Sequence, residues 1–197
     1  MAKSINGSTN VITGVGVGGL PDGIVDADML AANSVTAGKL ASGVGGKILQ
    51  VVSTTKTDTV SQNSNSFGNI SGMSVTITPS SSSNKILITG YVQVGINASQ
   101  YRTYIKITGG NSANYIGDAT TGVEAANVGV ARVSGDNYTQ ISVPLMYLDS
   151  PSTTSAITYQ VQWAQENNQT AYLNRPYTLD ASGSNVASTI TAMEVAA

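Results

Sequence analysis

The side chains best suited to binding chemistry lie in one predicted loop, before the last strand. Tyr172, Arg175 and Tyr177 surround Pro176 there, in a chain rich in Asn and Gln amides. Exposed tyrosine rings and amides suit sugars, because a sugar ring offers an apolar face and a rim of hydroxyl groups. We therefore predict Tyr172, Arg175 and Tyr177 as candidate receptor contacts, with a surface glycan as ligand. The alternative is that these tyrosines pack locally or at a seam between subunits.

No combination of residues indicates catalysis or a cofactor. The sequence contains neither cysteine nor histidine, which excludes disulfides, thiolate nucleophiles and triads with a histidine base. Glycoside hydrolysis needs two carboxylates that project into one cleft. The acidic residues of the second half instead stand singly in predicted turns, at Asp118, Glu124, Asp136, Asp149, Glu166 and Asp180. We predict that the protein is not an enzyme and that it holds no cofactor.

Two segments near the N-terminus could be mistaken for ligand sites. The glycine-rich residues 14–19 lack the Lys and Ser or Thr that complete a phosphate-binding loop, so an extended backbone explains them better. Asp22, Asp26 and Asp28 could supply oxygens to calcium, particularly where three chains meet. Their spacing differs from that of an EF-hand, and a solvated acidic patch is the favoured interpretation. No metal site is predicted.

Composition excludes several classes of partner. Only 10% of the residues are charged, the formal net charge is −2, and no basic run occurs. Binding to a phosphate backbone needs clustered Lys and Arg, so nucleic acid is not expected as a partner. No stretch approaches the ~20 apolar residues of a membrane span, and the first residues lack the pattern of a secretory signal. We expect no membrane insertion, and exposure on an exterior surface only as part of a particle.

Alternating apolar residues predict short β-strands from residue 47 onward. The strongest signal is residues 85–96, where five Ile and Val residues share one face. In residues 156–165, Tyr159, Val161 and Trp163 alternate with polar residues, which places Trp163 in the core. Eight to ten strands with turn signals every 8–12 residues predict an all-β domain, an antiparallel β-sandwich or jelly roll.

The same pattern gives three local expectations. Residues 55–72 are predicted as a polar connection with at most a brief strand near residues 67–70. The strand at 101–108 is predicted to point Lys106 outward, to solvent. Residues 149–151 are predicted to open a hairpin loop that leads into the strand at 156–165.

Residues 15–41 place an apolar residue at every fifth position, in three units of about ten residues. Neither a helix nor a strand produces this spacing, so the segment cannot bury its apolar residues by itself. Identical chains wrapped side by side would bury them, and we predict a trimeric oligomerisation stalk. The alternative is a flexible linker of small residues. The predicted seam comprises Val15, Leu20, Val25, Leu30, Val35 and Leu40.

The segment IVDADMLAANSVTAGKLASG, followed by GGKILQVVST and a Ser/Thr/Asn-rich β domain, resembles bacteriophage fibre proteins. The resemblance covers residues 24–54 and carries no catalytic motif. It implies a homotrimer on the exterior of the virion, made in the bacterial cytoplasm. Residues 1–14 would attach to other virion proteins, 15–46 would form the extended stalk, and 47–197 would form a β-sandwich knob that contacts the host surface. The chain is short for a tail fibre, so a head fibre or capsid decoration is the first alternative, and a carbohydrate-binding module the second.

Overall fold

The structure, a computed structural model, describes residues 4–6, 11–13, 30, 34–36, 39, 47–97, 101–109, 129–131, 137–179 and 184–197. The chain divides into two compact units, Met1–Gly46 and Lys47–Ala197. In the first unit, β1 (Ser4–Asn6) pairs antiparallel with β2 (Val11–Thr13). All other described strands belong to the second unit.

The alternating segments of the second unit form strands, and every described pairing between them is antiparallel. One 3₁₀ turn, η3 (Glu166–Asn168), follows β10. Among the described residues, no helix is long and apolar enough to cross a membrane. The strands are β3 (Ile48–Lys56), β4 (Ser61–Gln62), β5 (Gly68–Ile77), β6 (Lys85–Ile96), β7 (Thr103–Thr108), β8 (Gly129–Ala131), β9 (Ile141–Asp149), β10 (Ile157–Gln165), β11 (Ala171–Leu173) and β12 (Ser188–Val195).

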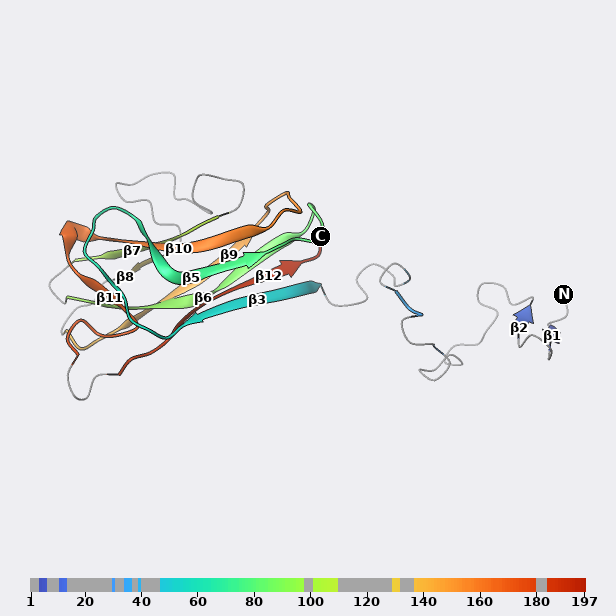
Figure 1. Ribbon diagram of the computed structural model, residues 1–197, viewed down its shortest axis with the longest axis horizontal. Helices are drawn as coiled ribbons and strands as arrows, with labels where there is room; N and C mark the ends of the chain where they lie inside the picture. The colour runs from blue at the N-terminus through green and yellow to red at the C-terminus, as the bar shows by residue number, and fades with distance from the viewer. Residues whose placement is uncertain are drawn as a thin grey trace. The chain divides into compact units, whose positions relative to one another are not determined.

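The strands form two sheets whose order is that of a jelly roll. The β10 sheet has the order β5-β10-β7-β8. In the β6 sheet, β12 and β9 pair with opposite edges of β6 and β3 lies beyond β12, while the short β11 and β4 extend the sheet at the far end of β6. The long strands largely alternate between the sheets along the chain, as in paired Greek keys. Figure 1 shows β5 and β10 in one layer and β3 and β12 in the other, which confirms the predicted all-β sandwich.

The core lies between the two sheets. Trp163 and Tyr159 on β10 are 2% and 0% exposed, which confirms that the face with Trp163 is buried. The Tyr159 hydroxyl donates a hydrogen bond of 2.7 Å to Oδ2 of Asp149, so it joins the β10 sheet to the end of β9. Burial, together with this hydrogen bond, raises the pKa of the Tyr159 phenol. The buried apolar side chains of β6 are Ile86, Ile88, Val92, Val94 and Ile96.

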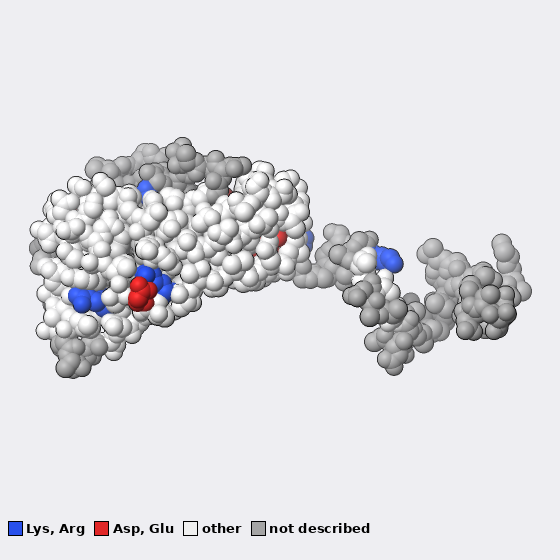
Figure 2. Space-filling view, viewed as in Figure 1, with Lys and Arg blue, Asp and Glu red and all other residues white. Residues whose placement is uncertain are grey.

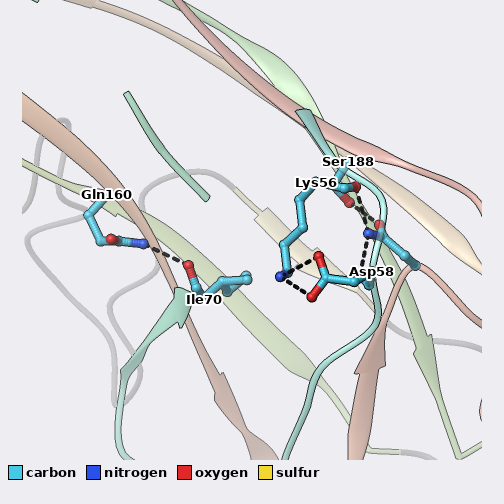
Figure 3. A network of polar contacts seen from close by, with 6 residues as sticks. Lys56, Asp58, Ile70, Gln160 and Ser188 are labelled. Atoms are coloured by element: carbon cyan, nitrogen blue, oxygen red, sulfur yellow. Dashed lines mark hydrogen bonds and ion pairs between the residues drawn. The ribbon is translucent and has the colours of Figure 1, made fainter. Parts of the chain in front are cut away.

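The strand predicted near residues 67–70 is longer than expected, because β5 runs from Gly68 to Ile77. The end of β3 and all of β4 also fall within the predicted polar connection. Strand β5 continues through a bulge at which Gly72 has a φ of 77° and the register with β10 shifts. The side-chain amide of Gln160 donates to the carbonyl oxygen of Ile70 at 2.9 Å (Figure 3). It also donates to the carbonyl oxygen of Met73 at 3.1 Å. A side chain of the neighbouring strand therefore satisfies backbone groups that the bulge leaves without ladder partners.

Two further expectations fail where long-range packing intervenes. Lys106 lies on the predicted outward face of β7, but it is only 2% exposed. Its ammonium lies 3.7 Å from the centroid of the Phe67 ring, a cation–π contact between β7 and the residue before β5. Residues 149–151 do not close a hairpin, since β9 belongs to the β6 sheet and β10 to the β10 sheet. The segment is an arch that crosses from one layer to the other.

Glu194, on β12, is a buried carboxylate that lies beside β3, the first strand of the second unit. It is 1% exposed and accepts hydrogen bonds of 2.6–2.8 Å from the side chains of Asn84, Ser80 and Gln50 and from the Ser80 backbone N–H. Burial alone would raise the pKa of this carboxyl, but the hydrogen bonds hold it at about 2, below the ordinary value of 4.5. The ionised carboxylate therefore ties β12 to β3 and to the turn that precedes β6.

Replacing Glu194 with glutamine is expected to lower the free energy of unfolding at neutral pH by about 1–3 kcal/mol. Because the pKa of about 2 in the folded state lies below the ordinary 4.5, the carboxylate stabilises the fold above that value, and the stabilisation is lost as the pH falls toward 2. Urea unfolding across this range is the measurement. Equal acid sensitivity of the wild type and Glu194→Gln would contradict the assignment.

Candidate functional site

The three predicted receptor contacts come together in the structure. Tyr172 is on β11 and half-buried, and the guanidinium carbon of Arg175 lies 3.8 Å from the centroid of its ring. The rings of Tyr172 and Tyr177 meet edge to face, with centroids 5.7 Å apart and an interplanar angle of 66°. Nη2 of Arg175 donates to the Tyr177 carbonyl oxygen at 3.1 Å. We call these three residues the tyrosine–arginine cluster.

Asn174 holds the loop of this cluster in place. It is fully buried and has a φ of 62°, a left-handed conformation that Asn tolerates better than most residues. Its side-chain amide donates to the carbonyl oxygens of Lys56 and Asp58, at 2.8 and 2.9 Å, and its Oδ1 accepts from the Ser188 hydroxyl at 2.6 Å. Figure 3 shows this network between the end of β3 and the start of β12. The loop is therefore fixed to the sheet by a buried polar side chain.

The Lys56 side chain lies in the same region and forms an ion pair with Asp58. Its ammonium lies 2.8 Å from both carboxylate oxygens of Asp58 (Figure 3). The hydrogen bond from Lys56 lowers the pKa of the Asp58 carboxyl. Since Asp58 is exposed, we regard this pair as a local brace for the β3–β4 connection rather than a large source of stability.

Gly95 allows the loop to approach β6 closely. A Cβ at this position would overlap the carbonyl oxygen of Arg175 and would lie 2.6 Å from Cα of Pro176. Pro176 is buried, and its burial anchors the backbone between Arg175 and Tyr177. The absence of a side chain at Gly95 therefore lets the backbone of Arg175 and Pro176 pack directly against β6.

The chemistry of the cluster is that of a small binding platform. Stacking on Tyr172 orients the Arg175 guanidinium while its charge persists. Nε of Arg175 is buried and has no hydrogen-bond partner among the described residues. Aromatic surface beside an oriented guanidinium suits a ligand with an apolar face and hydroxyl or carboxylate oxygens.

Two exposed apolar residues near the cluster were not predicted from sequence. The Thr178 N–H donates to the Asn137 carbonyl at 2.9 Å, which brings Tyr138 next to the loop. Tyr138 and Leu179 are 56% and 43% exposed. This long-range hydrogen bond joins the two segments, and no spacing in the sequence signals it.

The cluster and the start of the second unit lie at opposite ends of β6. Tyr172 pairs with Gly95, near the C-terminal end of the strand. Lys47 lies near the other end, where its carbonyl accepts a hydrogen bond from the Ala196 N–H at 2.7 Å and β12 pairs with Lys85. The ten steps along the strand from residue 85 to residue 95 span about 34 Å at ~3.4 Å per residue. Figure 1 shows β11 and the C-terminus at the two ends of the second unit.

Charged side chains are sparse on the described surface. Figure 2 shows a face that is almost entirely uncharged, with one group of acidic and basic side chains close together. Of the carboxylates predicted to stand singly, Asp149 accepts from Tyr159 and Glu166 forms a 2.9 Å ion pair with Arg102. No group of three or more acidic, His or Cys residues that could hold a metal occurs among the described residues. The acidic residues outside the described ranges are Asp22, Asp26, Asp28, Asp118, Glu124, Asp136 and Asp180.

The predicted stalk seam is described at two positions only. Leu30 and Val35 are 45% and 46% exposed in the single chain, so neither is buried by the chain to which it belongs. The other seam residues lie outside the described residues; they are Val15, Leu20, Val25 and Leu40.

No protein-family model and no curated protein matches the chain. Among solved structures, the chain is similar to one from the structure of infectious bursal disease virus Gx strain, with a TM-score of 0.39 and 14% sequence identity. It is also similar to one from the Gt strain of this virus, with a TM-score of 0.38 and 16% identity. The two alignments each cover 75% of this chain, and 37% and 38% of the viral chains. The chain therefore spans less than two-fifths of the length of these viral chains.

Proposed function

We propose that this chain is a non-enzymatic structural protein of a virus particle, a homotrimeric bacteriophage fibre or spike. Residues 1–14 attach it to other virion proteins, residues 15–46 form the trimeric stalk, and residues 47–197 form the knob. The sequence resemblance and the repeat support this proposal. The jelly-roll order adds an analogy at the level of fold, since viral capsid and lectin domains use it.

The observation that carries the proposal is the placement of the tyrosine–arginine cluster at the end of β6 opposite Lys47. A chain that is held at its N-terminal side presents that far end outward. Binding residues at the far end of the knob are where a fibre needs them, because they meet a surface before the rest of the domain does.

The ligand that the cluster supports best is a glycan of the host surface. The Arg175 guanidinium covers one face of the Tyr172 ring, so a sugar ring can lie on Tyr177 or on the surface of Tyr172 that remains. The guanidinium can pair with hydroxyl or carboxylate oxygens of the same ligand. Neutral surroundings permit binding that depends on shape and hydrogen bonds rather than on net charge. We expect affinity to be weak at each site and to increase when three knobs act together.

The test is binding of the full-length chain to a glycan array and to host cells. Tyr172→Ala/Tyr177→Ala is expected to reduce binding at least tenfold, which corresponds to about 1.4 kcal/mol. Tyr104→Ala, which removes a half-buried tyrosine from the outer face of the β10 sheet, is the matched control and should bind normally. Wild-type binding that survives the double substitution would assign recognition to another surface.

Two further observations separate this proposal from its alternatives. Labelled antibody on intact particles should decorate the tail for a tail fibre and the whole head for a head fibre or capsid decoration. Release of oligosaccharides from host polysaccharide by the purified chain would contradict the non-enzymatic role. A free carbohydrate-binding module predicts glycan binding by a monomer that does not co-purify with particles.

A further inference from the structure

An apolar row crosses the outer face of the β6 sheet, and no described residue covers it. Its members are direct cross-strand partners on β3, β12, β6 and β9, and cross-strand partners point to the same side of a sheet. They are Val51, Met193, Leu87 and Leu148. The outermost two, Val51 and Leu148, are 57% and 48% exposed. We call these four residues the apolar row.

Uncharged rows follow the apolar row along the strands, away from Lys47. The next row consists mainly of hydroxyl side chains and contains Ser53, Thr191, Thr89 and Met146. Residues that point outward on these strands between the apolar row and Gln93 include no charged side chain. Lys85 points outward one row nearer to Lys47, so only the part of the face from the apolar row to Gln93 is uncharged.

The face can supply part of an interface. From the apolar row to Gln93, four strands ~4.8 Å apart and seven residues long, at ~3.4 Å each, give a footprint of roughly 450 Å². A standard protein–protein interface buries about 800 Å² on each partner, so this face would supply about half of one. Apolar patches of a few hundred Å² are often functional.

We propose that this face packs against the same face of identical chains, in a cyclic assembly whose axis runs along the strands. In such an assembly every row lies at the same height in each copy. The apolar row then meets apolar rows, and the Ser53 and Thr191 hydroxyls meet hydroxyls that can donate and accept in turn. Copies packed in opposite directions would place Val51 and Leu148 against hydroxyl rows instead.

The position of the face favours identical chains as the occupant. β3 begins directly after Lys47, so the apolar row lies only a few residues from the start of the second unit. Chains joined through residues 15–46 would hold these faces near one another at high effective concentration. The inference rests on the proposed trimer and adds a second contact to it, within the knob.

The first test measures the solution mass of the full-length chain by light scattering at micromolar concentration. Val51→Lys/Leu148→Lys is expected to convert a species of three times 20.1 kDa into monomers or into a mixture with a mass at least twofold lower. Both replaced side chains are about half exposed, so each subunit should keep its circular dichroism spectrum. Thr158→Lys, an exposed position on the outer face of the β10 sheet, is the control and should remain trimeric.

The second test keeps the proposal falsifiable if the lysine variant does not fold. The chain has no cysteine, so Met193→Cys introduces a unique thiol on the face, and Thr158→Cys introduces one on the opposite sheet. A short bis-maleimide reagent should cross-link the Met193→Cys chain into dimers at least tenfold more efficiently than the Thr158→Cys chain. Equal cross-linking of the two variants would overturn the inference.

The outcomes separate this inference from the proposed function. If Leu30→Asp/Leu40→Asp yields monomers while Val51→Lys/Leu148→Lys stays trimeric, the face is not an interface and the proposed stalk stands. If the stalk variant stays trimeric and the face variant dissociates, the knob face alone holds the assembly. A wild-type chain that is monomeric overturns both.

Discussion

Replacing Asn174 with alanine is expected to destabilise the second unit by about 3–5 kcal/mol, in the range typical of a broken buried hydrogen-bond network. The side chain satisfies the carbonyl oxygens of Lys56 and Asp58 and accepts from Ser188, all in a fully buried site. Alanine removes all three hydrogen bonds, and the Ser188 hydroxyl keeps the one that it accepts from the Gln93 N–H. Urea unfolding measures the effect, and binding by the tyrosine–arginine cluster should weaken in parallel.

Asn167 provides a matched control for this substitution. It has a φ of 53°, close to the 62° of Asn174, but its side chain is exposed. Asn167→Ala therefore reports the cost of placing alanine in the left-handed region, about 1 kcal/mol. A similar loss at both positions would show that backbone strain, and not the buried network, makes Asn174 important.

Replacing Gly95 with alanine is expected to displace the loop of the tyrosine–arginine cluster and to reduce glycan binding more than tenfold. The new Cβ would overlap the Arg175 carbonyl and crowd the buried Pro176, and backbone atoms cannot yield as a flexible side chain can. We expect a loss of more than about 2 kcal/mol in the free energy of unfolding as well. Thermal unfolding measures the loss of stability, and the glycan array measures the loss of binding.

Gly68→Ala is the control for the loss of a strand glycine. The three atoms nearest to a Cβ at Gly68 all belong to the Gln62 side chain, with Oε1 at 3.3 Å, so a shift of a few tenths of an ångström in that side chain accommodates the methyl group. This variant should keep both stability and binding. Wild-type binding by Gly95→Ala would mean that the cluster does not depend on its close approach to β6.

The strands themselves could be predicted, because burial on one face leaves a direct mark on the sequence. The long strand over 85–96 and the buried face with Trp163 follow from residue alternation. The jelly-roll order could not be predicted in detail, since alternation says which side is buried and nothing about which strand is the neighbour. The expected hairpin at 149–151 shows this, because its two strands are consecutive in sequence and belong to different sheets.

The candidate site was predictable in its residue types and not in its construction. Tyr172, Arg175 and Tyr177 lie within six residues of one another in sequence, so a local loop could bring them together. Their support comes from Asn174 and Gly95, whose partners are distant along the chain. Lys106 was expected in solvent for the same reason, because its contact with Phe67 joins two separate strands. Pairwise contacts over long sequence separations leave no periodic signal.

The measurement that tests the central claim most directly is the solution mass of the unmodified full-length chain by light scattering. The proposed fibre predicts three times 20.1 kDa over a range of concentrations. A monomer of 20.1 kDa would contradict it: residues 15–46 would then be a linker, and a free binding module would be the better description of the chain.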